Sequence, residues 1–330
     1  MLINLHSHLE GRVRPATAAE IAARCGLPEP PQGWEKAIRL NGPADLTAYL
    51  ARVSSTYPFF GSGDALARIT REAVEDAAAD GQDYLELRFG PASHTRDGFG
   101  LDDVIAAALD GLHDGIRATG MPADLVVATL RLHSPELNEE VARAAVRRAG
   151  DGVVGLDLAG DELIHPDIAP HAAAFAIARA GGLGVTCHAA EAGPGSAAQD
   201  AARLLGATRI GHGAHIVDDP AVTRWVAEQG LVVEICPTSN WYTGAISAVG
   251  RHPARRFIDA GIPLVLGDDN PEQTGSPLSA EAELLTGPLR FTTHERAALD
   301  ATSLAAAFMD DSVRRDLLAR LRGGEPQPSI

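Results

Sequence analysis

The chain has 330 residues with 44 acidic and 28 basic side chains, which give a formal net charge of −16 at pH 7. A surface of that sign repels phosphate, so nucleic acids and anionic membranes are not expected partners. The amino terminus has no basic region ahead of an apolar stretch, and the three cysteines have no paired spacing, so we expect a soluble cytoplasmic protein without a disulfide framework.

Eight short apolar runs recur along the chain, and Ala-rich segments with helical spacing lie between them. The predicted strands cover residues 2–8, 84–89, 123–130, 153–158, 183–188, 208–211, 231–236 and 263–267. Helices are clearest over residues 102–119, 135–149, 166–180, 196–205, 220–229 and 252–260. Because strand and helix alternate eight times, the sequence predicts an α/β fold, a single (β/α)8 TIM barrel domain over residues 1–330.

Two stretches do not follow this repeat. Residues 15–81, between the first and second strands, are too many for one connecting helix. We expect a helical insertion packed on the barrel, and a mobile lid over the site is the alternative. The chain after Asp300 is expected to form an amphipathic helix that closes the barrel.

Several predicted strands end in residues of types that can bind metals. Active sites of such barrels lie at the carboxyl ends of the strands. These side chains are His6 and His8 on the first strand, His188 on the fifth, His212 on the sixth and Asp268–Asp269 on the eighth. The i, i+2 spacing of His6 and His8 directs both imidazoles to the same side. Asp-Asp before Asn-Pro is also typical of a simple turn. Found together, however, imidazoles and a carboxylate at separate strand ends predict a zinc site.

A set of motifs follows in order through nearly the whole chain. They are HSHLEG (6–11), YLELRF (84–89), DLAGDE (157–162), TCHAAE (186–191), RIGHG (209–213), CPTSN (236–240) and TGA (243–245). Together they resemble the motifs of the adenosine/adenine deaminase family, metal-dependent purine aminohydrolases of the amidohydrolase superfamily. The resemblance implies hydrolytic deamination of a 6-aminopurine base or nucleoside with release of ammonia.

The resemblance also implies a role for individual residues. The implied ligands of one zinc ion are His6, His8, His188 and Asp269. Zinc would lower the pKa of its bound water from about 16 to about 7. His212 would orient this water and help remove its proton, Asp269 would bond both metal and water, and protonated Glu191 would donate to ring N1. The backbone N–H of Gly160 would meet ring N3, which requires close approach of the main chain.

Two positions that concern the substrate depart from the family pattern, and a third residue, Arg12, lies close to one of them. Asn270 stands where a second Asp usually faces ring N7, and its amide can donate there. A shifted alignment would instead make Asp268 the metal ligand and Asp269 the purine contact. Glu10 replaces the Asp that meets the ribose, which favours free adenine or a modified nucleoside. Arg12 is either a solvent-facing charge or a contact for an anionic substituent, as on aminodeoxyfutalosine.

Three other functions are alternatives to deamination of an ordinary 6-aminopurine. A 5′-extended nucleoside or a non-purine aminoheterocycle is an alternative substrate. A two-metal amidohydrolase also begins with His-x-His, but its bridging carboxylated lysine is not available, since Lys36 is the only lysine and lies in the insertion. A catalytically inactive purine-binding barrel is an alternative from a different class, and metal analysis with an ammonia-release assay would distinguish it.

Overall fold

The computed structural model describes residues 1–323, and eight parallel strands in sequential order form its centre. The strands are β1 (Ile3–His8), β2 (Tyr84–Phe89), β3 (Ala123–Leu130), β4 (Val153–Ala159), β5 (Gly184–Ala189), β6 (Arg209–His212), β7 (Val232–Ile235) and β8 (Leu264–Leu266). The first strand pairs with the residues that follow the last strand, through a parallel bridge between Ser7 and Asp269. The predicted barrel is therefore confirmed, with every strand within two residues of its expected bounds.

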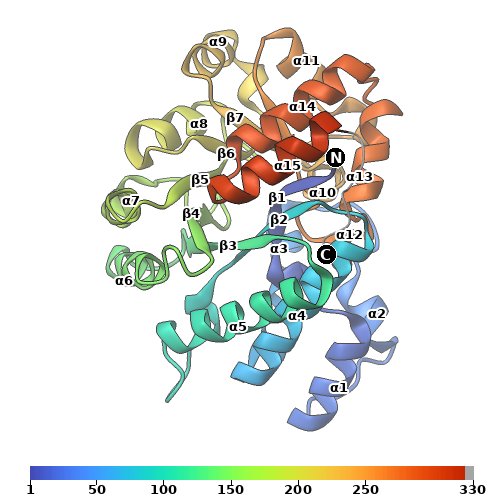
Figure 1. The fold of residues 1–330 in the computed structure, drawn as a ribbon, viewed down its shortest axis with the longest axis vertical. Helices are drawn as coiled ribbons and strands as arrows, with labels where there is room; N and C mark the ends of the chain where they lie inside the picture. The colour runs from blue at the N-terminus through green and yellow to red at the C-terminus, as the bar shows by residue number, and fades with distance from the viewer. Residues whose placement is uncertain (324–330) are drawn as a thin grey trace.

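Helices cover the outside of this barrel, and α5 to α9 follow one another around it (Figure 1). The helices are α1 (Pro15–Cys25), α2 (Gly33–Ile38), α3 (Leu46–Ser54), α4 (Gly63–Ala79), α5 (Leu101–Thr119), α6 (Pro135–Val146), α7 (Ala172–Ala180), α8 (Ser196–Asp200), α9 (Pro220–Gln229), α10 (Pro237–Tyr242), α11 (Ala254–Asp259), α12 (Pro271–Thr274), α13 (Leu278–Thr286), α14 (Thr293–Ala306) and α15 (Asp311–Gly323). Asp45, Ser62 and Ser134 accept backbone N–H bonds at the starts of α3, α4 and α6. In the described part of the chain, no helix combines the length and apolar character that a membrane span requires.

The predicted start of one helix is wrong. The helix expected over residues 166–180 begins only at Ala172, after a short 3-10 helix over Ala169–His171. Pro170 has no amide hydrogen to donate, so a helix that began at residue 166 would be interrupted there. Upstream, the Asp161 carboxylate accepts backbone N–H bonds from Leu163 and Ile164 and holds this segment as a loop.

The carboxyl-terminal part forms two helices, α14 and α15, where the sequence predicted one. They cross in front of the strands beside the amino terminus (Figure 1). The connection between them carries Phe308, whose ring fills the amino-terminal end of the barrel. A Cβ on Gly155 or Gly184 would lie 2.7 or 2.2 Å from this ring, and the Arg209 guanidinium lies 3.8 Å from its centroid. The break between the helices therefore places an aromatic plug against two strands that lack side chains there.

The segment 15–81 folds into α1, α2, α3, a 3-10 helix over Tyr57–Phe60, and α4. Helix α4 packs along α5, as the helix between β1 and β2 of a barrel does. Phe59 and Phe60 are buried in the main hydrophobic core. Helix α3 lies over the carboxyl ends of the strands, where it lines the central cavity.

Glu281 on α13 makes stability depend on pH. It is 1% exposed and accepts hydrogen bonds from the backbone N–H of Thr238 and from Ser276, and burial raises its pKa from 4.5 to about 7. The folded state therefore binds this proton more tightly than the unfolded state, and stability falls as pH rises from 4.5 through 7. Relative to wild type, Glu281→Gln should therefore have a free energy of unfolding that rises by about 2 kcal/mol between pH 5 and pH 8. Urea unfolding of both proteins at the two pH values measures this difference.

Glu283 on the same helix is exposed and provides the matched control. Glu283→Gln should change the free energy of unfolding by similar small amounts at both pH values. A Glu281→Gln variant whose gain is the same at pH 5 and pH 8 would show that this carboxyl is not penalised on ionisation.

Candidate active site

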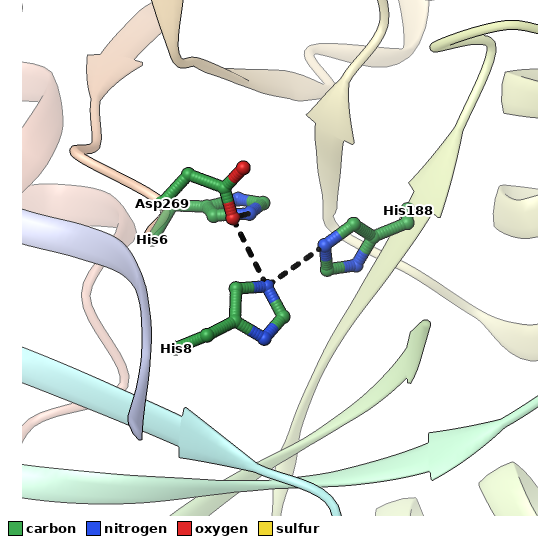
Figure 2. Close-up of side chains that lie close together, drawn as sticks. All are labelled: His6, His8, His188 and Asp269. Atoms are coloured by element: carbon green, nitrogen blue, oxygen red, sulfur yellow. Dashed lines mark hydrogen bonds and ion pairs between the residues drawn. The ribbon is translucent and has the colours of Figure 1, made fainter. Parts of the chain in front are cut away.

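Four side chains converge at the carboxyl ends of β1, β5 and β8: His6, His8, His188 and Asp269 (Figure 2). Each offers one nitrogen or oxygen, and these atoms all lie within 4.8 Å of one another. His8 Nε2 is 3.1 Å from His188 Nε2 and 3.3 Å from Asp269 Oδ1. The bridge between Ser7 and Asp269 explains the proximity, because it pairs the end of β1 with the residues after β8.

The chemistry of this group fits a divalent cation. His6 Nδ1 lies 2.6 Å from Glu234 and His188 Nδ1 lies 2.9 Å from Asp157, so both rings donate outward and turn the lone pair of Nε2 toward the group. His6 Nε2 is buried and has no hydrogen-bond partner. Burial lowers the pKa of His8 to about 3, so this imidazole is neutral and has a free lone pair. Bare lone pairs facing a carboxylate are the donor set that zinc prefers.

Beneath this group, buried charges support the imidazoles. Arg88 donates to Asp157 (3.1 Å) and Glu234 (2.9 Å), and Arg209 donates to Glu234 (2.7 Å) and Glu86 (2.5 Å). All five side chains are at most 1% exposed. No role was predicted for these residues from the sequence, although charged residues inside apolar strands were the available signal.

The two adjacent aspartates face different partners. The carboxylate of Asp269 joins the imidazoles, whereas that of Asp268 accepts a 2.6 Å hydrogen bond from Arg12 Nη2. Arg12 also donates to Ser7 Oγ and is only 4% exposed. Both expectations for Arg12 are therefore wrong, since it neither faces solvent nor lines the central cavity. The isolated arginine after HSHLEG gave no hint of a partner 256 residues away.

Glu191 lies in the loop after β5 and His212 is the last residue of β6, and their side chains lie side by side. Glu191 Oε2 is 3.7 Å from His212 Nε2, and Glu191 Oε1 is buried without a hydrogen-bond partner. Burial, together with the charges of Asp269 and Glu162, raises the pKa of Glu191 well above its usual range. Burial lowers the pKa of His212 well below its usual range. Both shifts favour the uncharged forms, a protonated carboxyl beside a neutral imidazole.

The loop that carries Glu191 is held by Glu162, a residue for which no role was predicted from the sequence. Its carboxylate accepts backbone N–H bonds from Ala190 (3.0 Å), Ala192 and Gly193 (2.7 Å). The backbone is strained here, because Ala190, His212 and Asp269 adopt φ values of +56°, +66° and +57°. Such conformations cost about 1–3 kcal/mol each and persist where the surroundings hold them, typically at functional sites.

A cavity of about 270 Å³ opens above these residues. Its walls include Glu10, Gly160 and Asn270, the three residues assigned to the substrate, together with His8, His188, Glu191, His212, Asp269 and seven residues of α3. Gly160 has a φ of +109°, which favours glycine. Thr47 on α3 donates a 2.6 Å hydrogen bond to Asp161 after β4 and so links α3 to the rim of the barrel.

Asn270 is held by protein groups. Its Nδ2 donates to Asp269 Oδ1 (2.7 Å) and to Tyr49 Oη (3.0 Å), so both amide hydrogens are used. Tyr49 Oη and Ser239 Oγ in turn donate to Asp269 Oδ2. Tyr49 belongs to α3, and nothing in the sequence of the insertion indicated that it reaches Asp269. To donate a hydrogen bond to ring N7, Asn270 would have to break one of these two hydrogen bonds.

Glu10 lies at the side of the same cavity. Its Oε1 accepts hydrogen bonds of 3.0 Å from the Gly90 backbone N–H and from His94 Nε2. The carboxylate is therefore held by the turn that follows β2.

Known proteins are similar to this chain over nearly its whole length. The adenosine deaminase family model matches residues 2–323. Adenosine deaminase from Enterococcus faecalis is 32% identical over 95% of this chain and 93% of its own. Adenine deaminase from Rhizobium johnstonii is 33% identical over 97% of this chain and 98% of its own.

Solved structures show the same architecture. Adenine deaminase from Arthrobacter aurescens matches with a TM-score of 0.88 at 25% identity, covering 97% of each chain. An amidohydrolase from Burkholderia ambifaria with bound Zn has a TM-score of 0.88 at 26% identity, covering 97% of this chain and 89% of its own. Arabidopsis ADAL in complex with IMP has a TM-score of 0.86 at 25% identity, covering 97% and 95%. With a family model that spans nearly all of it, the chain belongs to the adenosine deaminase family.

Proposed function

We propose that the protein removes the exocyclic amine of an uncharged 6-aminopurine, as the free base or a nucleoside, with one zinc ion held by His6, His8, His188 and Asp269. As a member of its family the protein is a hydrolase of C–N bonds in 6-aminopurines. The observation that carries the proposal is the convergence of three imidazoles and a carboxylate beside the cavity that Glu191 lines.

The residues divide the chemistry between them. A bound zinc ion would acidify water, lowering its pKa from about 16 to about 7, and so supply a nucleophile at neutral pH. Glu191 has a raised pKa and a free Oε1, so it can give its proton to ring N1 as oxygen attacks C6. The ring then carries no added negative charge. The amine leaves the tetrahedral carbon as ammonia by taking up the proton of the oxygen that attacked C6, and that oxygen becomes the carbonyl oxygen of the product. The backbone N–H of Gly160 would hold ring N3, and Glu10 would face the ring's substituent.

The charge of the cavity favours an uncharged substrate. Among the described residues that line it, four are carboxylic acids, Glu10, Asp161, Glu191 and Asp269, and none is lysine or arginine. The nearby Arg131 donates to the backbone carbonyls of His165 and His188, and Arg12 is bound to Asp268. A phosphate or carboxylate would therefore meet like charges without a cation partner. This favours a base or nucleoside over a nucleotide such as the IMP bound to ADAL, or over aminodeoxyfutalosine.

A substrate panel with metal analysis tests the proposal. The zinc-loaded protein is assayed for ammonia release with adenine, adenosine, 2′-deoxyadenosine, AMP, aminodeoxyfutalosine and a non-purine aminoheterocycle. We expect turnover of adenine or a neutral nucleoside, and at least about 100-fold lower kcat/KM for AMP. Stoichiometric zinc without turnover of any compound would favour an inactive purine-binding barrel.

Two further assignments are proposals of the same kind. Residues 15–81 would act as a lid through α3, which lines the cavity and is tied to the rim by Thr47. Cytoplasmic location is supported by the three free cysteines, Cys25, Cys187 and Cys236.

A further inference from the structure

A buried chain of hydrogen bonds ends at Nδ1 of His212, the ring nitrogen that faces away from Glu191. The backbone N–H of Ala254 lies 3.1 Å from His252 Nδ1, His252 Nε2 lies 3.1 Å from Asn240 Oδ1, and Asn240 Nδ2 lies 3.0 Å from His212 Nδ1. His252, Asn240 and His212 are 5%, 0% and 1% exposed. Neither His252 nor Asn240 lines the cavity.

The direction of every bond in this chain is fixed by its first donor. A backbone N–H can only donate, so His252 Nδ1 accepts the bond from Ala254 and carries no hydrogen. Burial lowers the pKa of His252 to about 3, so the ring is neutral and its single hydrogen is on Nε2. This hydrogen is donated to Asn240, which must therefore present its oxygen to His252 and its NH2 group to His212.

We propose that His252 and Asn240 fix His212 as the tautomer with hydrogen on Nε2, so that His212 donates a hydrogen bond to the attacking oxygen. This inference rests on the proposed function, and it revises the expectation that His212 removes a proton from water. A neutral imidazole that accepts at Nδ1 has no lone pair at Nε2 with which to act as a base. Its N–H instead lies on the side of Glu191, whose Oε2 is 3.7 Å from Nε2.

A donor at this position has two effects on the reaction. It stabilises negative charge on the oxygen, and it directs the remaining lone pairs away from the imidazole toward the substrate. Asn240 and His252 are then positioning residues, because they act on the reaction only through His212. Asn240 is the last residue of the CPTSN motif, which follows β7. His252 lies two residues before the start of α11.

The tautomer can be measured directly in the wild-type protein. Histidine labelled with 15N is incorporated into the zinc-loaded enzyme, and long-range 1H–15N correlations identify which ring nitrogen carries hydrogen. The signals of His212 are assigned by their loss in His212→Asn. We expect the hydrogen on Nε2 and an unprotonated Nδ1. Hydrogen on Nδ1 would overturn the proposal, whether or not any variant folds.

Asn240→Asp reverses the polarity of the chain, because a carboxylate accepts from both histidines. The variant should shift the His212 hydrogen to Nδ1 and lower kcat about 100-fold, with zinc content and KM nearly unchanged. A kcat within about threefold of wild type, with the tautomer reversed, would contradict the proposal. If no substrate is turned over while the Nε2 hydrogen is found, the proposed function fails and the tautomer assignment stands.

The chain contains a matched control for this substitution. Asn138 Nδ2 lies 3.0 Å from His171 Nδ1 in a second buried Asn–His pair, and neither residue lines the cavity. Asn138→Asp introduces the same carboxylate beside a histidine and should leave kcat of the folded protein unchanged. An equal loss of kcat in both variants would mean that the effect of Asn240→Asp is only structural.

Discussion

Glu191→Gln is expected to lower kcat by about a thousandfold while the protein keeps its zinc. Glutamine has the same shape and fills the same space, but it has no acidic proton to give to ring N1. Glu191 has an unpartnered Oε1 beside the cavity, so the substitution breaks no hydrogen bond of that atom. Turnover is measured by ammonia release, and zinc by elemental analysis of the same samples.

Glu272 provides the control for this substitution. Burial raises its pKa as well, but it lies outside the central cavity. Glu272→Gln should therefore retain nearly full activity. If Glu191→Gln also retained near-normal kcat, Glu191 would not be the proton donor, and the acid at ring N1 would have to be sought elsewhere in the cavity.

The strands and the ends of the strands could be predicted because a parallel barrel repeats one simple pattern. His6, His8 and His188 are each at the carboxyl end of an apolar run, and the barrel brings such ends together regardless of their separation in sequence. The same logic placed His212 beside Glu191. The local pattern was sufficient here because the position along a strand determines the position in the fold.

Contacts made by loops and by the insertion could not be predicted in this way. Tyr49 reaches Asp269 from α3, and Arg12 reaches Asp268 from the turn after β1. Neither partner follows from periodicity, because both depend on how a non-repeating segment packs on the barrel. The same holds for Asn270, whose amide looked free in sequence but donates to Asp269 and Tyr49.

The adjacent aspartates should respond in opposite ways to truncation. Asp269→Ala removes the carboxylate that lies 3.3 Å from His8 Nε2 and should weaken zinc binding by more than about 100-fold. Asp268→Ala should retain stoichiometric zinc, because that carboxylate bonds Arg12 and lies outside the group of imidazoles. Zinc is measured after dialysis against a weak chelator, with thermal unfolding of the same samples.

Asp268→Ala has its own expected cost, which separates the two roles. Arg12 is 4% exposed, so loss of Asp268 leaves a buried guanidinium without its ion-pair partner and should destabilise the fold by about 3–5 kcal/mol. The Asp268→Ala variant should therefore have a lower melting temperature but keep its metal, whereas the Asp269→Ala variant should lose its metal. Metal loss in Asp268→Ala with retention in Asp269→Ala would instead support the shifted alignment, in which Asp268 is the ligand and Asp269 meets the purine.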